Sequence, residues 1–238
     1  MEVASLYREP EAPVTIEWPA LTFRDVFKLY REGPVETVAL RGLDFEVARG
    51  EMVAVLGPSG SGKSTLLHLA AGMDVPSAGD VRAFGRSLAR LDEPELAGYR
   101  AREIAVVFQS DNLWLSLTAE ENVLVSLELA GVGGGRRAGA ALAEFGLEGR
   151  RGHRPSQLSG GEQQRVALAA AAAREAPLVL ADEPTGELDG KNERVVLDAL
   201  RRLRDVHGAT VVAVTHSARL AEAADRVIEL LDGRVRAD

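Results

Sequence analysis

The sequence predicts an α/β domain with a mostly parallel central sheet, and two observations predict it. Short apolar runs at 104–108, 178–181 and 210–214 have the continuous apolar character of strands buried on both faces, and segments with helical periodicity lie between them. A further apolar run, 52–56, leads into the glycine-rich loop 57–64 and then into a helical pattern. Strands that alternate with helices in this way form parallel sheets.

Composition narrows the classes of partner. The 238 residues include 28 Lys and Arg against 36 Asp and Glu, a net charge of −8. Since proteins that bind a nucleic-acid backbone usually carry a basic surface, no nucleic-acid partner is expected. There is no cysteine, which excludes disulfides and thiolate metal sites. No apolar stretch reaches the roughly 18 residues of a membrane span, so membrane association is expected only through a partner.

The first part of the chain is expected to be a leader followed by one domain. Residues 1–19 carry three prolines and no sustained period, which predicts a flexible N-terminal leader before a domain that spans 20–238. At the start of this domain, 20–27 and 38–47 are predicted strands, with a turn-forming segment at 31–34 between them.

A block of helices is expected within the sheet domain. After a short strand at 80–84 and a helix at 94–102, the pattern is helical over 118–146, with a glycine-rich turn at 131–135. Because this block lies between strands, the sequence predicts a helical subdomain inserted at about 110–160.

The last third of the chain returns to alternating strands and helices. Ser159 is expected to cap a helix, with Glu162 completing a capping box, and Pro177 is expected to end that helix. An amphipathic helix at 192–206 and a hairpin at 227–235 are predicted to follow.

The glycine-rich loop matches the pattern of a phosphate-binding loop in full. Its small residues let backbone N–H groups converge on an anion at the start of the following helix. Lys63 is expected to neutralise the β- and γ-phosphates of a nucleotide, and the Ser64 hydroxyl to ligate Mg²⁺. The alternative is an ordinary glycine-rich turn. The loop residues are Gly57, Pro58, Ser59, Gly60, Ser61, Gly62, Lys63 and Ser64.

Polar residues follow three of the predicted strands, at the sheet edge where such folds place their ligands. Asp182 is suited to holding Mg²⁺, and Glu183 to polarising a water for attack on a γ-phosphate. The amide of Gln109 can join the Mg²⁺ shell, and His216 can donate to a γ-phosphate oxygen. The alternatives are a solvated acidic strand end and a histidine that only packs.

A second potential anion site lies far along the chain. Ser159, Gly160, Gly161 and Glu162 combine a hydroxyl, glycine amides and a helix N-terminus. The chain has a single phosphate loop but two potential anion sites. This arrangement is explained if two chains bind each nucleotide between them.

Together these motifs resemble the ATP-binding cassette (ABC) ATPase subunits, from about residue 20 to the C-terminus. The resemblance implies a phosphate-loop NTPase fold with an antiparallel β subdomain and an inserted helical one, and ATP and Mg²⁺ as cofactors. The segments that carry it, besides the phosphate loop, are Gln109 of the Q-loop, the signature 158–165, the Walker B strand 178–182, the D-loop 186–189 and the switch histidine His216.

The resemblance also implies roles for single residues. Tyr30, just past the first predicted strand, stands at the adenine-stacking position, whereas its residue pattern alone favours a loop plug. Glu183 is implied as the catalytic base, with Gln109 and His216 beside it at the reacting phosphate. Mg²⁺ is implied to bind Ser64, Gln109 and Asp182. Nucleotide contacts beyond the phosphate loop are implied for Thr65, Ser159, Gly160, Gly161, Glu162 and Asp189.

Within the family, two segments resemble a subgroup of lipoprotein-release, macrolide-export and division-associated cassettes, which work with membrane subunits. They are 153–157, before the signature, and 181–186 together with 188–189. Two residues depart from the family pattern: Glu187 stands where a small or amide residue is usual, and Ala170 where an Arg is common. Glu187 adds charge near the implied dimer seam.

The resemblance implies two kinds of protein partner. In a head-to-tail homodimer, Ser159 and Gly161 of one chain would contact the γ-phosphate held by Lys63 of the other. The segment 110–115 would line a groove for transmembrane permease subunits, with Trp114 at the seam, and burial of Trp114 in the helical subdomain is the alternative. This places the protein at the cytoplasmic face of the cell membrane.

Three functions share these motifs. The main hypothesis is an ATP-hydrolysing motor subunit of a transport or extraction complex. A regulatory ATPase that gates a cell-wall enzyme through a membrane partner has the same motifs. A non-transport cassette ATPase acting on DNA or ribosomes is disfavoured, because the segment between Gln109 and Leu158 is too short for a long coiled coil and the chain has one cassette.

Overall fold

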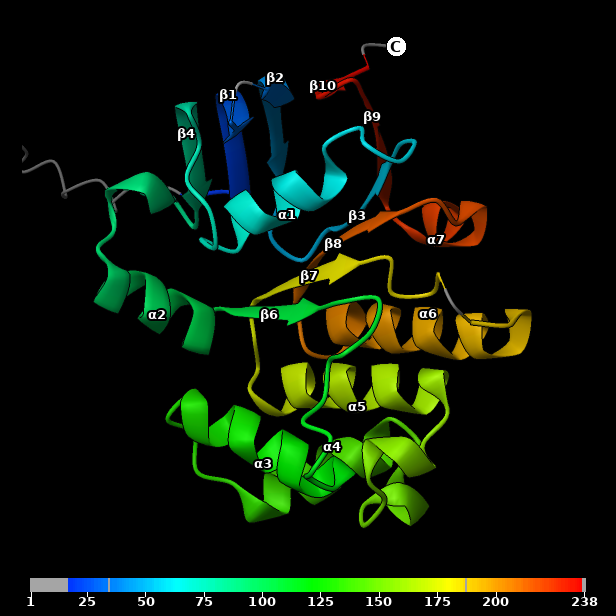
Figure 1. Cartoon of the computed structure of the whole chain (residues 1–238). Helices are drawn as coiled ribbons and strands as arrows, with labels where there is room; N and C mark the ends of the chain where they lie inside the picture. Colours follow the sequence, from blue (N-terminus) through cyan, green and yellow to red (C-terminus); the bar gives the residue numbers. More distant parts are fainter. Residues whose placement is uncertain (1–16, 34, 187, 237–238) are drawn as a thin grey trace, which may run out of the picture.

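The computed structural model describes residues 17–33, 35–186 and 188–236, and it confirms the predicted α/β class (Figure 1). Of the predicted leader, 1–16 lie outside the described residues. At its end, the Trp18 carbonyl accepts a hydrogen bond from Arg49 Nε at 3.1 Å. The described part of the leader therefore contacts the domain.

The central sheet has six strands in the order β10-β9-β3-β8-β7-β6, and every neighbouring pair is parallel except β10 and β9. The predicted hairpin at 227–235 is confirmed, but its first strand also pairs in parallel with β3, which the sequence did not predict. The strands are β3 (Met52–Leu56), β6 (Ile104–Val107), β7 (Leu178–Asp182), β8 (Thr210–Thr215), β9 (Arg226–Leu231) and β10 (Arg234–Val235).

A second, antiparallel sheet has the order β2-β1-β4-β5 and confirms the implied β subdomain. The predicted strand ends near the hairpin were wrong: the first strand continues to Glu32, so Tyr30 lies within it and not past its end. The reason is long-range pairing, since Tyr30 is opposite Thr37. Of the predicted turn 31–34, Pro34 lies outside the described residues. The strands are β1 (Leu21–Glu32), β2 (Val35–Val47), β4 (Ala78–Ala83) and β5 (Arg86–Ser87).

The predicted helices are present, with two differences. The signature helix ends at Ala173 and not at Pro177, because Glu175 adopts a φ of 55° and its N–H donates to the Ala172 carbonyl. Helix α7 had not been predicted. The helices are α1 (Lys63–Ala70), α2 (Glu93–Arg102), α3 (Ala119–Leu129), α4 (Gly135–Glu144), α5 (Gly160–Ala173), α6 (Gly190–Asp205) and α7 (Ala218–Ala223), with 3₁₀ turns at Leu88–Arg90, Glu148–Arg150 and Pro155–Gln157.

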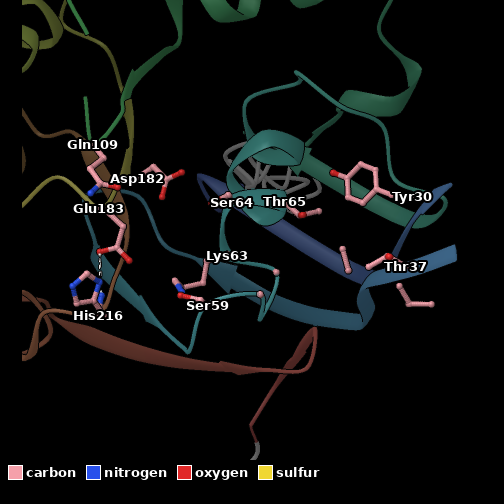
Figure 2. Close-up of a pocket in the computed structure, with 14 residues that line it drawn as sticks. Tyr30, Thr37, Ser59, Lys63, Ser64, Thr65, Gln109, Asp182, Glu183 and His216 are labelled. Carbon is pink, nitrogen blue, oxygen red and sulfur yellow. Dashed lines mark hydrogen bonds and ion pairs between the residues drawn. The ribbon is translucent and has the colours of Figure 1, made fainter. Parts of the chain in front are cut away.

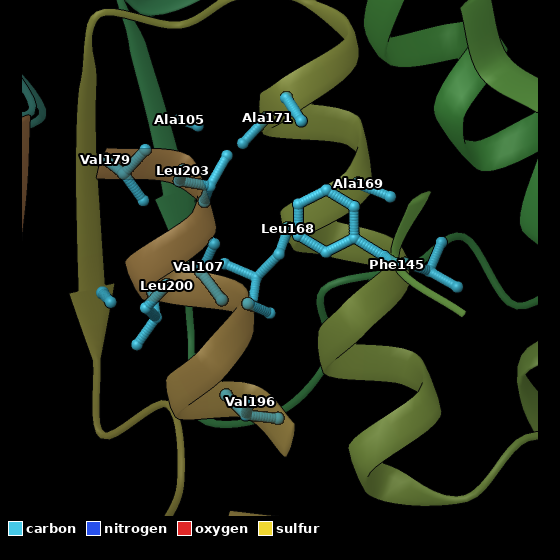
Figure 3. Close-up of a cluster of buried hydrophobic side chains, with 14 of the residues drawn as sticks. Ala105, Val107, Phe145, Leu168, Ala169, Ala171, Val179, Val196, Leu200 and Leu203 are labelled. Atoms are coloured by element: carbon cyan, nitrogen blue, oxygen red, sulfur yellow. The ribbon is translucent and has the colours of Figure 1, made fainter. Parts of the chain in front are cut away.

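Side chains of the central sheet alternate between two hydrophobic cores. Met52 of β3 belongs to the core shared with α5 and α6, and its neighbour Val53 belongs to the core shared with α1 and the antiparallel sheet. Figure 3 shows Leu168 of α5 and Leu200 of α6 in the first core, where both are fully buried. Each such leucine contributes about 2 kcal/mol by burial. Both faces of the sheet are thus covered, which leaves the strand ends to form a site.

Helices α3 and α4 pack against each other and against α5, and Figure 1 shows them beyond α5, away from both sheets. Because they lie between β6 and β7 in the chain, we infer that the segment at about 110–160 is the inserted helical subdomain. None of the described helices is long and apolar enough to cross a membrane.

Candidate active site

A cavity of about 630 Å³ opens at the carboxyl ends of β3, β6, β7 and β8 (Figure 2). It brings together most residues singled out in the sequence and adds three from β2, Thr37 to Ala39, that sequence reasoning missed. Contacts between distant segments, among them the pairing of β2 with β1, place those three near the phosphate loop, so no local pattern marks them. The lining residues are Tyr30, Thr37, Val38, Ala39, Ser59, Gly60, Gly62, Lys63, Ser64, Thr65, Gln109, Asp182, Glu183 and His216.

The phosphate loop is held by the C-terminal hairpin. The Gly233 N–H donates to the Ser61 carbonyl at 3.0 Å, and the Gly233 carbonyl accepts from the Arg41 N–H at 2.8 Å. At the start of the loop, any Cβ on Gly57 would collide with the Leu230 carbonyl of β9, so only glycine fits there. Contacts with β9 and with the hairpin that bonds to β2 therefore hold the loop in place without a ligand.

Lys63 and the start of α1 are arranged for an anion. The Lys63 ammonium donates to the carbonyls of Gly57, at 2.7 Å, and Pro58, at 3.0 Å. The N-cap residue, Gly62, has no side chain to cap the helix. The first amides of α1 and the lysine thus present positive charge to the cavity.

Asp182 and Ser64 form the part of the site suited to a divalent cation. Burial raises the pKa of Asp182, and Glu183 raises it further, while the hydrogen bond from the Ser64 hydroxyl opposes the rise. With the amide oxygen of Gln109, these groups offer the hard oxygen ligands that Mg²⁺ prefers. The described residues contain no cluster of three or more His, Cys, Asp or Glu side chains placed to hold a metal.

Glu183 and His216 form a contact across two strand ends. One Glu183 carboxylate oxygen lies 3.0 Å from His216 Nδ1 and accepts the His216 backbone N–H at 3.2 Å. The Glu183 side chain is 15% exposed, whereas that of His216 is 70% exposed. Glu183 also adopts a φ of 45°, a strained conformation for this residue type that is typical of active sites. The carboxylate is therefore held in one orientation at the edge of the cavity.

Tyr30 lies at the other end of the cavity. In Figure 2, Tyr30 and the Glu183–His216 pair are at opposite ends, with Lys63 between them. The Tyr30 ring lines the cavity and is 36% exposed, so it does not plug a loop. An extended ligand with an aromatic group at one end and phosphates at the other matches this layout.

The signature residues lie outside this cavity. Ser159 caps α5 as predicted: its hydroxyl accepts the Glu162 N–H at 3.3 Å, and Glu162 accepts the Ser159 N–H at 2.8 Å. Asp189 likewise caps α6. Among the described residues that line the cavity, none comes from 159–162 or from 186–189. Glu187 itself lies outside the described residues.

Trp114 borders a separate groove of about 170 Å³ between the segment after β6 and helices α3 and α5. Its exposure is 65%, so the alternative that it is buried in the helical subdomain is wrong. Leu115 and Leu129 are also exposed, at 73% and 67%. Ala170, which the resemblance places where an Arg is common, also lines this groove.

Comparison with known proteins adds the following. A family model described as "ABC transporter" matches residues 40–186. The chain is 44% identical to the lipoprotein-releasing system ATP-binding protein LolD of Geobacter metallireducens, over 92% of this chain and 98% of that one. It is 42% identical to the macrolide export ATP-binding/permease protein MacB of Azoarcus sp., over 92% of this chain but only 34% of MacB.

A solved structure is similar as well. It is the dimeric, post-hydrolysis state of the ATP-binding cassette MJ0796 bound to ADP and Pi, with a TM-score of 0.84 and 39% identity over 91% of this chain and 97% of that one.

Proposed function

The chain belongs to the ABC transporter family of ATP-binding proteins and is an ATPase, and we propose that it is the motor subunit of a membrane transport or extraction complex. One observation carries the residue assignments: a single cavity joins Lys63 and Ser64 of the phosphate loop to Asp182, Glu183 and His216. These are the groups that phosphoryl transfer to water needs, namely a phosphate cradle, metal ligands and a group that orients water.

The residues along the cavity would contact each part of a nucleotide, from its base to its phosphates. Tyr30 would stack on the base, and Lys63 would exchange its loop carbonyls for the β- and γ-phosphates. Ser64, Gln109 and Asp182 would hold Mg²⁺, which when bound neutralises phosphate charge and orients the γ-phosphate. Those oxygen-bearing side chains fit the ion, and the phosphates would supply the remaining ligands.

Hydrolysis would then proceed in line. Glu183 would accept a hydrogen bond from a water whose oxygen attacks the γ-phosphorus, while the bond to the oxygen bridging the β-phosphate breaks. The proton of the water passes to the carboxylate and then to the released phosphate, leaving ADP. His216, which contacts Glu183 at 3.0 Å, would keep the carboxylate oriented and donate to a γ-phosphate oxygen.

The site is proposed to be completed by a second copy of the chain. The signature residues cap α5 and do not line the cavity, so within one chain the γ-phosphate would meet only the phosphate-loop side. In a head-to-tail homodimer, Ser159 and Gly161 of the partner would cover it. The dimeric form of the similar cassette MJ0796 supports this arrangement.

Membrane subunits are the proposed second partner. The names of the similar proteins LolD and MacB concern lipoprotein release and macrolide export, and MacB joins its ATP-binding part to a permease. The groove beside Trp114 is also lined by the exposed Leu129, and the exposed Leu115 follows Trp114 in the chain; such a surface would suit an apolar helix from a membrane subunit. The protein would then act at the cytoplasmic face of the membrane.

The Glu183→Gln variant tests the catalytic assignment. Glutamine keeps the shape but cannot accept a proton, so ATP hydrolysis is expected to fall at least about a hundredfold while ATP binding persists. Glu175→Gln is the matched control, because Glu175 also adopts a positive φ, of 55°, but lies on the surface. Ordinary phosphate release by Glu183→Gln would reject the assignment of this residue.

The same variant tests the membrane partner. Tagged Glu183→Gln chain would be purified from detergent-solubilised native membranes with ATP and Mg²⁺, and its partners identified by mass spectrometry. Recovery of a polytopic membrane protein is expected, and a Trp114→Ala version should recover less of it. Recovery of only ribosomes or DNA-repair proteins would reject the transport function and leave the ATPase activity standing.

A further inference from the structure

We propose that Lys28 and Asp74 are positioning residues that hold the Tyr30 ring as the stacking surface for the nucleotide base. The inference rests on the proposed function, because it assigns two further residues to the base end of the same site. Among the described residues that line the cavity, neither Lys28 nor Asp74 is present, so both would act through Tyr30.

The Asp74 carboxylate is the centre of this arrangement. It lies in the connector after α1, and its two oxygens accept from three donors: the Lys28 ammonium at 2.5 Å, the Tyr30 hydroxyl at 2.8 Å and the Val75 N–H at 2.7 Å. Because Tyr30 and Asp74 are 44 positions apart, these bonds join β1 to a different segment of the chain. A carboxylate with both oxygens engaged has little freedom to move.

Lys28 supports Tyr30 from a second direction. Its ammonium lies over the Tyr30 ring, 4.9 Å from the centroid, and also donates to the Val75 carbonyl at 2.8 Å. The Lys28 and Asp74 side chains are 12% and 27% exposed, so solvent screens this pair less than a surface pair. A cation over one face of the ring leaves the opposite face for a base.

The protonation states fit this role. Burial alone would raise the pKa of Asp74, but the hydrogen bonds from Lys28, Tyr30 and the Val75 backbone together lower it below its usual range. Burial raises the pKa of Tyr30 and Asp74 raises it further, while a hydrogen bond with the Thr65 side chain opposes the rise. Near neutral pH the carboxylate is thus charged and the phenol is protonated, as the hydrogen bond between them requires.

The functional consequence is preorganisation. Tyr30 is 36% exposed and lies near the hairpin end of β1, so its ring is held by polar contacts with Asp74, Lys28 and the Thr65 side chain and not by burial. A base that stacks on a ring already held in place does not bear the entropy cost of ordering it. Loss of the pair should therefore weaken binding through the base and leave binding through the phosphates unchanged.

The experiment compares two ligands that differ in the base. Isothermal titration calorimetry with Mg²⁺ would measure dissociation constants for ATP and for inorganic tripolyphosphate in Lys28→Met and Asp74→Asn. Each variant is expected to bind ATP about tenfold more weakly, as for partial loss of a base–aromatic stack. Its affinity for tripolyphosphate is expected to equal that of the unmodified chain. Arg24→Met is the matched control, because Arg24 is on the same strand and pairs with Glu46 at 3.0 Å.

A second comparison separates positioning from general damage. In a Tyr30→Ala background, Asp74→Asn is expected to cause no further loss of ATP affinity, because residues that act through one another are not additive. Three results would each overturn the inference. Asp74→Asn could lower ATP affinity equally with and without Tyr30→Ala, or the variants could weaken tripolyphosphate binding as much as ATP binding. The third is unchanged ATP binding in both Lys28→Met and Asp74→Asn. An unmodified chain that binds neither ligand would instead overturn the proposed function on which it rests.

Discussion

The N-terminal ends of α1 and α5 are both built from small residues and both suited to anions, yet they are completed differently. At α1 the N-cap is Gly62, which has no side chain, and the loop before it is held by backbone contacts to β2 and β9. At α5 the N-cap is Ser159, which forms a capping box with Glu162. The first end leaves its dipole and amides to a ligand, whereas the second is stabilised by its own side chains.

This difference is consistent with the proposal that two chains complete the site. The end of α1 opens into the cavity with Lys63 beside it, while the end of α5 is stable by itself and lies outside the cavity. A self-capped helix end can remain folded and exposed until a second chain brings a phosphate to it. The predictions below test this division, beginning with the largest expected effect.

The first concerns the charge at the α1 end. Among the described residues that line the cavity, Lys63 is the one Lys or Arg. Lys63→Met removes its positive charge, so ATP hydrolysis is expected to fall about a thousandfold. Phosphate release under saturating ATP measures it. Lys191→Met, in the first turn of α6, is the control and should retain activity. Near-normal hydrolysis by Lys63→Met would remove α1 from the phosphate site.

The second compares two capping boxes. Ser159→Ala and Thr118→Ala each remove an N-cap oxygen that accepts a backbone N–H at 3.3 Å, in α5 and α3 respectively. Each should lower the free energy of unfolding by about 1 kcal/mol. Only Ser159→Ala should also lower hydrolysis, by about a hundredfold, because it alone removes a proposed donor to the γ-phosphate. Equal activity of the two variants would mean that Ser159 only stabilises α5 and does not contact the nucleotide.

The third tests the backbone support of the phosphate loop. Gly233 has a φ of 76°, and a Cβ there would lie 2.5 Å from the Ala39 carbonyl. Gly233→Ala should therefore destabilise the chain by about 3 kcal/mol, from left-handed strain and the collision, and weaken ATP binding. The matched control is Gly208→Ala, which has a φ of 66° with nothing within 4 Å.

Urea unfolding and ATP titration separate the two effects. Gly208→Ala should show the smaller strain cost and normal ATP affinity. If both variants bound ATP equally well, the hairpin would support the fold without shaping the loop.

The smallest effect concerns the pH dependence of the α5 cap. Hydrogen bonds from Arg150 and from the Ser159 backbone lower the pKa of Glu162 to about 2. Since the unfolded value is about 4.3, the stabilisation is complete above that pH and is lost as the pH falls toward 2. It should amount to about 1 kcal/mol, because solvent screens the half-exposed Arg150.

The measurement is the difference in unfolding free energy between the unmodified chain and Glu162→Gln at pH 6 and at pH 3. The difference should shrink at the lower pH. Glu121→Gln, the corresponding change in the α3 capping box, is the comparison. A difference that grew on acidification would contradict the assigned charge state of Glu162.

Much of the fold was predictable because its signals are local. The continuous apolar runs predicted β3, β6, β7 and β8, and capping residues predicted the start of α5. One error arises where a local signal competes with distant pairing, and another where a local turn had no clear signal in the sequence. β1 extends past its predicted end because it pairs with β2, and α5 ends before Pro177 because Glu175 turns the chain first.

By itself the sequence determined the chemical parts of the site and the strand ends that carry them, since the phosphate loop and the polar residues after each strand are local patterns. Only the tertiary structure decided how those parts are held. The contact of Glu183 with His216, the bond from Gly233 to Ser61 and the support of Tyr30 by Asp74 each join distant segments. Strand order and register bring these segments together, and neither is encoded in any short stretch of residues.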